Sequence, residues 1–470
     1  MARRLLTFDF LRGFAIIWIA VFHVLVLTCD LFPQAKSDPF SLPFYYLAIM
    51  VACVVFGHWR GFFLIISGVV HIHAMTTAIR KGADRKRVWL SQVTFGVALW
   101  GFGMFREVFL NEWSMPRSML KGATFLEALG EQWAWIYLME AIEAVAWAII
   151  ITSTVFFFLT ANNGIEKTKR NAIIFGALAL FAVFFAPVLN QMVTAHYGVN
   201  VARKGPEDLD FLHGIGYVFW FFKAPFIGYC SPLFPMLGYS FTGVVVGLLL
   251  TGRNVPRTLP RNVSLAAVGL IVFGALWLWL VTGLPEDLGK LITFQFHPTW
   301  FVFVATGMQL LMITGMLRLI EFNPRVNVQT ALRWTKPGRR WGVTALTVYS
   351  FLCVEYLVRA GMGLVFPQFD WMADNTLPFG WTVFLIAVVL LVWDVTLRLW
   401  EQVNFKYSFE WLLTWLAKRN KPFKRFDRGD LMNVQGILRD PMPVLFVDPE
   451  APQPMPVAAP SPSRVRQENA

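Results

Sequence analysis

Long apolar runs restrict the fold of this chain more than any other feature of its sequence. A bilayer core about 30 Å thick is crossed by an α-helix of about 20 residues, because each residue adds about 1.5 Å of rise. We therefore predict an all-α polytopic membrane protein with about ten transmembrane helices. The runs lie near residues 10–28, 60–79, 89–110, 134–159, 171–190, 233–251, 263–283, 298–320, 342–366 and 379–400.

The composition supports a membrane protein and argues against a nucleic-acid partner. Of the 470 residues, 56% are hydrophobic and 15% are charged, whereas about 25% of the residues of a soluble domain are charged. A net charge of +12 would suit nucleic acid in a soluble protein. In a membrane protein, however, Lys and Arg collect in cytoplasmic loops. We therefore expect membrane lipids, and not nucleic acid, as partners of this chain.

The basic residues of the loops alternate from one side to the other. They are frequent at the N-terminal tip and after the second, fourth, sixth and eighth runs, and sparse in the other loops. This asymmetry predicts a multi-pass protein of the cell membrane with both termini in the cytoplasm. The residues that carry it include Arg3, Arg4, Arg80, Lys81, Arg85, Lys86, Arg87, Lys167, Lys169, Arg170, Arg253, Arg257, Arg261, Arg325, Arg333, Lys336, Arg339 and Arg340.

Two leftover apolar stretches and the C-terminal part complete the organisation. We expect 44–57 to form a short helix at the outer face, and 211–229 to be interfacial or re-entrant, because only one full crossing fits there. The predicted units are a transmembrane domain over 1–402, an amphipathic basic segment on the membrane surface over 403–439, and a disordered Pro-rich cytoplasmic tail over 440–470.

The four cysteines and the clustered histidines do not indicate a metal site. No Cys-x-x-Cys pair is present. Free thiols are the favoured interpretation, with a disulfide left open. His71 and His73 are two residues apart, so they face different sides of a helix and make a poor pair of metal ligands.

Polar residues mark the first apolar run. Asp9 and Arg12 are neighbours in its first turn, Gly13 follows, and His23 lies in the apolar part. Ionisable groups in a membrane helix are costly and therefore indicate function. The pattern Asp9-x-x-Arg12-Gly13-x-Ala15, with His23 eleven residues after Arg12, and the later motif 61–68 that ends in Ser67-Gly68 resemble the membrane-bound acyltransferase 3 and heparan-α-glucosaminide N-acetyltransferase-like proteins. Weaker similar blocks lie at 231–239, 296–300, 345–349 and 409–413.

The resemblance implies an enzyme that moves an acyl group, with acetyl as the expected one, from cytoplasmic acyl-CoA to an outer acceptor. That acceptor would be a sugar, a glycan or a glycolipid. No metal cofactor is implied. Basic side chains recognise phosphate, so Arg12, Arg80, Arg85 and Arg87 are the candidates for holding CoA. The alternative for these residues is that they serve membrane orientation alone.

Helical rise places three polar residues at similar depth. His23 lies about 20 Å from the inner end of its run, Glu355 lies at a similar height, and Ser67 lies about 10 Å from the outer end of its own. We predict that they share a cavity with His23 as general base. Glu355 would orient the imidazole, Ser67 would donate a hydrogen bond, and Asp9 completes the catalytic set.

Several alternatives remain open at this stage. His23 could instead carry the acyl group covalently. Glu355 could be no more than the ion-pair partner of Arg359. Should His23 not be the base, Glu355 or Glu143 would be the better candidate. At the level of the whole protein, the competing hypotheses are a transporter whose buried His and Glu relay protons or substrate, and an acyltransferase-like scaffold without activity. The acceptor, O- versus N-acylation and homo-oligomer formation are left open.

Overall fold

The structure is a computed structural model, and it is a helical membrane protein, as predicted. It describes residues 4–38, 41–57, 60–111, 115–199, 212, 214–228, 230–252, 255–282, 297–418, 431–439, 441 and 443–446. Within these ranges, nine helices are long and apolar enough to cross a membrane. They are α1 (Leu6–Thr28), α4 (Arg60–Arg80), α5 (Arg85–Phe109), α8 (Ala141–Leu159), α9 (Thr168–Tyr197), α11 (Leu233–Leu250), α12 with its π-helical end (Leu259–Thr282), α14 (Thr299–Leu319) and α18 (Phe379–Gln402).

The predicted span over 342–366 is not one continuous helix. The chain there forms the end of α15 (Val328–Val343), then α16 (Ala345–Ser350) and α17 (Val354–Gly363), with breaks between them. A broken helix is stable in an apolar environment only where other groups satisfy its backbone. Here a carboxylate from the C-terminal part of the chain does so, and a hydropathy pattern cannot reveal such a partner.

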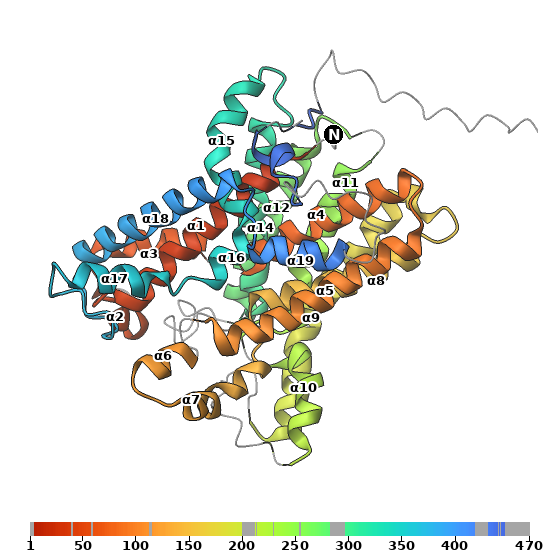
Figure 1. Ribbon diagram of the computed structural model, residues 1–470. Coiled ribbons are helices and arrows are strands. Elements are labelled where there is room, and N and C mark those ends of the chain that lie inside the picture. The colour runs from red at the N-terminus through yellow and green to blue at the C-terminus, as the bar shows by residue number, and fades with distance from the viewer. Residues whose placement is uncertain are drawn as a thin grey trace, which may run out of the picture.

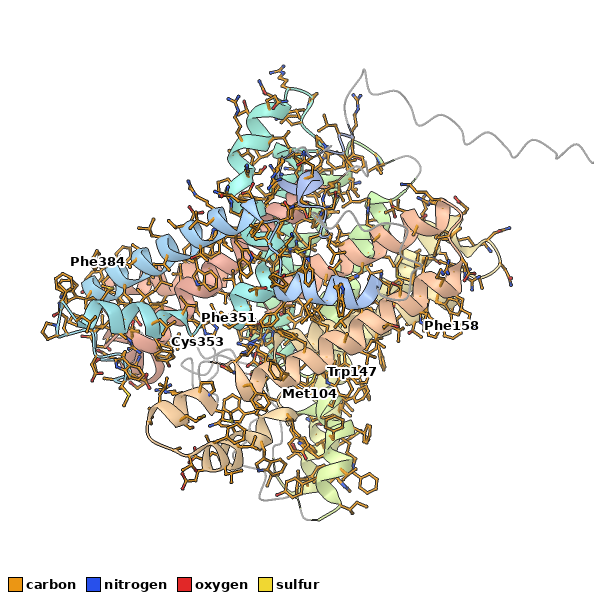
Figure 2. All side chains as sticks on the ribbon, in the orientation of Figure 1. Met104, Trp147, Phe158, Phe351, Cys353 and Phe384 are labelled. Carbon is orange, nitrogen blue, oxygen red and sulfur yellow. The ribbon has the colours of Figure 1, made fainter. Side chains whose placement is uncertain are left out.

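The helices pack in two groups around a shared centre (Figure 1). In one group α1 packs against α15, α18 and α3 (Phe44–Gly57); in the other, α11 packs against α4 and α9, and α5 packs against α8. Apolar side chains such as Phe158 on α8 and Phe384 on α18 project outward at opposite sides (Figure 2). These are the side chains expected to meet lipid.

The two leftover apolar stretches form short helices. One is α3, and the other is α10 (Gly216–Ile227), which has 12 residues. Twelve residues span about 18 Å, too little for a bilayer core, so α10 fits the predicted non-spanning segment. His213, in the same stretch, lies outside the described residues.

Gly13 is the point of closest approach between α1 and α15. A Cβ at Gly13 would overlap the carbonyl oxygen of Gly338, and it would also crowd the backbone nitrogen of Gly342. Both obstacles are backbone atoms and cannot rotate away. The glycine of the Asp9–Ala15 motif therefore has a packing role, which allows the helix that carries Arg12 to lie directly on α15.

We expect Gly13→Ala to lower the stability of the detergent-solubilised protein by about 1–3 kcal/mol, the usual cost of overpacking. The measurement is thermal unfolding followed by circular dichroism. Gly101→Ala in α5 is the matched control, because a Cβ there would meet no atom within 4 Å. An equal melting temperature for the two variants would contradict the close-approach assignment.

The C-terminal part is packed onto the bundle more extensively than predicted. The predicted surface segment 403–439 contains α19 (Phe409–Lys418), which packs against α5 and α16. Val444 N donates to Arg4 O at 2.9 Å, and Phe446 N donates to Glu321 O at 2.8 Å. Residues 443–446 therefore belong to the folded domain rather than to the predicted tail. The remainder of the tail, 447–470, lies outside the described residues.

One buried arginine anchors the segment 431–439. Arg339 of α15 is 1% exposed. Its guanidinium donates to the carbonyl oxygens of Ile437 and Leu332, and to Thr335 Oγ1 at 3.2 Å. A buried cation that is held by several acceptors is costly to leave unpaired. The segment is thus fixed beside the C-terminal half of α15, and its apolar pattern does not predict this contact.

Candidate functional site

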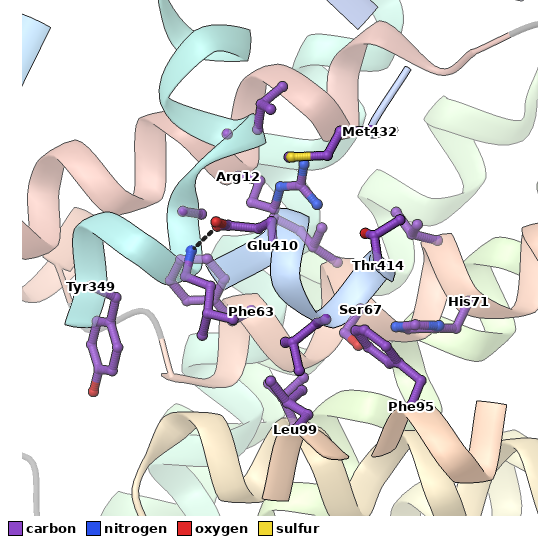
Figure 3. Close-up of a pocket in the computed structure, with 18 of the residues that line it drawn as sticks. Arg12, Phe63, Ser67, His71, Phe95, Leu99, Tyr349, Glu410, Thr414 and Met432 are labelled. Carbon is purple, nitrogen blue, oxygen red and sulfur yellow. Dashed lines mark hydrogen bonds between the residues drawn. The ribbon is translucent and has the colours of Figure 1, made fainter. Parts of the chain in front are cut away.

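A cavity of about 450 Å³ lies between α1, α4, α5, α8, α16 and α19 (Figure 3). Its wall is mainly aliphatic and aromatic, and a few polar side chains converge on it. Such a mostly apolar pocket with a few placed polar groups is typical of small-molecule sites. The polar side chains that matter here are Arg4, Arg12, Ser67, His71, Tyr349 and Glu410.

Two arginines, Arg4 and Arg12, line the cavity wall. Arg4 is held by Asp9 in a two-point ion pair, with Nε–Oδ2 at 2.9 Å and NH2–Oδ1 at 3.0 Å. Arg12 Nε is buried and makes no hydrogen bond within the described part of the chain. Asp9 therefore neutralises Arg4, whereas Arg12 retains hydrogen-bonding capacity for an anionic ligand. The sequence interpretation placed Asp9 beside Arg12 and counted Arg4 only toward membrane orientation.

Ser67 and His71 lie on successive turns of α4, and both line the cavity. His71 Nδ1 is 2.7 Å from Gln92 Oε1 on α5. Its ring also packs against Phe95, with the two ring centroids 6.0 Å apart. Sequence reasoning considered His71 only as a poor metal ligand. The four-residue spacing from Ser67 was the available signal, because residues i and i+4 share a helix face.

Glu410 joins two sequence blocks that lie far apart in the chain. Its carboxylate accepts hydrogen bonds from Leu346 N at 2.5 Å, Thr347 N at 3.2 Å and Thr347 Oγ1 at 2.5 Å; one of these bonds is dashed in Figure 3. In return, Phe409 N donates to Thr347 Oγ1 at 2.9 Å. The carboxylate therefore caps the first turn of α16, whose backbone donors have no partner within their own helix.

The environment of Glu410 acts on its ionisation in two opposing ways. Burial raises the pKa of Glu410, and the hydrogen bonds from Leu346 and Thr347 oppose that rise. Burial is the larger influence. The carboxyl group is thus easier to protonate than that of an exposed glutamate. In each of its three hydrogen bonds the carboxylate is the acceptor.

Of the three residues that were predicted to share a cavity, Ser67 lines this one, and His23 and Glu355 are not in its wall. A site shared by all three stays a prediction. His23 is half-buried on α1. It is eleven residues beyond Arg12, which places it about 16 Å further along nearly the same helix face. Depth along a helix does not define which face a side chain occupies, so equal depth alone does not establish that the three side chains meet.

Glu355 forms the ion pair that was left open as an alternative. Both it and Arg359 are 0% exposed, and Arg359 NH2 lies 3.4 Å from Glu355 Oε1. Arg359 also donates to Trp371 O at 2.9 Å and to Ala373 O at 2.8 Å. This pair fixes α17 to the loop that follows it. The assignment of Glu355 as the group that orients an imidazole gains no support from this placement.

The basic cluster after α4 also lies apart from the cavity. Arg80 donates to Thr251 O and lies 4.0 Å from Glu166, and Arg85 packs over the ring of Phe157 at 4.8 Å. The backbone of Arg87 is capped by Asp84. Arg80 is nine residues, or about 13 Å, beyond His71 along α4. Of the four predicted CoA-binding arginines, Arg12 alone lines the cavity.

A second polar cluster lies at the opposite end of α4. Arg60 NH2 contacts Glu140 at 3.1 Å, and Arg60 NH1 contacts the Sγ of Cys230 at 2.6 Å. Arg106 pairs with Glu107 and stacks over Tyr349, a cavity residue, at 4.3 Å. The cluster therefore reaches the cavity through Tyr349.

Glu143 lies in the same region, at the start of α8. It is 0% exposed, and its carboxylate oxygens make no hydrogen bond within the described residues. Buried carboxylates without partners are costly, which makes Glu143 a candidate functional group. It was named from the sequence as a replacement base.

No family model matches this chain, and no curated protein does so either. The resemblance to acyltransferases therefore depends on the short motifs alone.

Proposed function

We propose that the protein is a membrane acyltransferase that moves an acyl group, expected to be acetyl, from acyl-CoA to a sugar, glycan or glycolipid on the outer side of the cell membrane. The observation that supports this best is the largely apolar cavity with Arg12 in its wall. An apolar cavity suits the acyl group and the pantetheine arm that joins it to the phosphates of CoA. A guanidinium suits those phosphates. The acyltransferase-like motifs of the sequence add independent support.

The proposed reaction breaks the C–S bond of the thioester and forms a C–O or C–N bond to the acceptor. A base takes the proton of the acceptor hydroxyl or amine, and that proton ends on the departing CoA thiolate. His23 is the proposed base, because neutral imidazole is suited to proton transfer near pH 7. The proposal gives Glu355 no direct part, since Arg359 holds it.

We expect Arg12→Gln to raise the dissociation constant of acetyl-CoA about tenfold or more, the usual value of a charge-assisted hydrogen bond to phosphate. Isothermal titration calorimetry on the detergent-solubilised protein measures it. The triple variant Arg80→Gln, Arg85→Gln, Arg87→Gln tests whether the nucleotide part reaches the end of α4. Unchanged affinity in the triple variant would assign those residues to orientation, and unchanged affinity in Arg12→Gln would contradict donor binding at this cavity.

A transporter is the second candidate function. The buried cluster around Arg106, Glu107 and Glu143 favours it, since such groups can relay protons across a membrane. The purified protein distinguishes the two functions: an acyltransferase cleaves or transfers from acetyl-CoA without a gradient. A transporter instead dissipates an imposed proton gradient in liposomes and leaves acetyl-CoA intact.

A further inference from the structure

The hydrogen bond between His71 and Gln92 fixes how the imidazole faces the cavity. Gln92 Oε1 is an acceptor, so His71 Nδ1 carries the proton of the 2.7 Å contact. The neutral ring then has its lone pair on Nε2. The hydrogen bond that the structure gives the ring within the described residues is the one at Nδ1, so Nε2 is left to face the cavity. His71 thus presents a hydrogen-bond acceptor in the wall of the cavity.

Ser67 supplies the complementary group one turn away. Residues four apart on a helix have Cβ atoms about 5–6 Å apart, and both side chains line the cavity. Figure 3 shows His71 and Ser67 on the same side of the cavity, across from Arg12. A hydroxyl can donate where the imidazole accepts. Together the two side chains match the N–H and the C=O of one amide group.

We propose that Ser67, His71 and Gln92 form a site that recognises an amide of the pantetheine arm of the donor. This proposal rests on the proposed function, because pantetheine joins the phosphates of CoA to its thioester through two amide bonds. Arg12 would hold the phosphate end, and the amide would bind at His71 Nε2 and Ser67 Oγ. Gln92 is then a positioning residue, which keeps the imidazole in the tautomer that accepts the amide N–H.

The site is tested by calorimetric titration of acetyl-CoA into the wild-type protein and into His71→Leu, His71→Gln and Gln92→Leu. We expect His71→Leu to raise the dissociation constant about tenfold, since a buried ligand N–H would lose its acceptor. The dissociation constant of His71→Gln should remain within about threefold of the wild-type value, because the glutamine amide oxygen can accept the same hydrogen bond. The dissociation constant of Gln92→Leu should lie between those of His71→Gln and His71→Leu. His73→Leu, on another face of α4, is the matched control.

Two readouts separate recognition of the arm from other roles. At saturating acetyl-CoA, His71→Leu should retain kcat and its pH profile; a lower kcat with an altered pH profile would make His71 a base and overturn the proposal. Ethyl thioacetate, a thioester without amides, should be turned over equally by wild type and His71→Leu. Equal affinity of the wild type and His71→Leu for acetyl-CoA would also overturn the proposal. If the wild type binds no acetyl-CoA, the proposed function itself fails, together with this site.

Discussion

Replacing His23 by Ala is expected to lower acyl transfer about 10²–10⁴-fold, the usual contribution of a positioned acid–base group. The fold should survive, because His23 is only half-buried and contributes little to the core. The measurement is transfer of a labelled acetyl group from acetyl-CoA, with thermal unfolding as the check on folding. His196→Ala is the control, because that histidine lies near the C-terminal end of another helix, α9, and has no proposed part in the reaction.

His23→Gln separates basicity from hydrogen bonding. Glutamine can donate and accept hydrogen bonds but takes no proton near pH 7. We expect it to be as impaired as His23→Ala. Near-normal turnover would show that His23 is not the base, and the buried carboxylate of Glu143 would become the better candidate. An acylated His23 trapped and identified by mass spectrometry would instead make it a covalent carrier.

Replacing Glu410 by Ala is expected to have the largest effect on stability. Its carboxylate is the acceptor for two backbone N–H groups and one hydroxyl at the start of α16. Each partly buried donor left without an acceptor costs about 1–3 kcal/mol. We therefore expect a total loss of about 3–5 kcal/mol, seen as a much lower melting temperature and a poor yield of monodisperse protein.

Glu410→Gln is the informative companion variant. Its single carbonyl oxygen can still accept one or two of the bonds, so it should lose less than half as much stability as Glu410→Ala. Thr347→Val removes the hydroxyl from the same cluster and should resemble Glu410→Gln. A Glu410→Ala protein as stable as wild type would contradict the capping role and would leave α16 without an explanation for its position.

The apolar runs predicted nine of the long helices because burial in lipid is a property of each segment by itself. The run at 342–366 has the same composition but depends on Glu410, about 60 residues away in sequence. Residues 443–446 resembled a tail because their docking uses backbone hydrogen bonds to Arg4 and Glu321, which composition does not encode. Sequence periodicity therefore identifies helices that fold by their own hydrophobicity and misses elements that are held by distant polar partners.

The site was predicted in part for a similar reason. Arg12 and Ser67 were found because a polar residue in an apolar run is conspicuous, and both line the cavity. His71 was noticed but set aside, because its partner Gln92 is on the next helix. The blocks that contain Thr347 and Glu410 were both singled out from the sequence, yet nothing in it indicated that they bind each other.

The most direct test of the central claim is a cryo-electron microscopy map of the protein with acetyl-CoA. We predict density for the donor in the cavity between α1, α4 and α19, with a phosphate at the guanidinium of Arg12 and the arm passing Ser67 and His71. Donor density at another place in the bundle, or an empty cavity at saturating acetyl-CoA, would contradict the account.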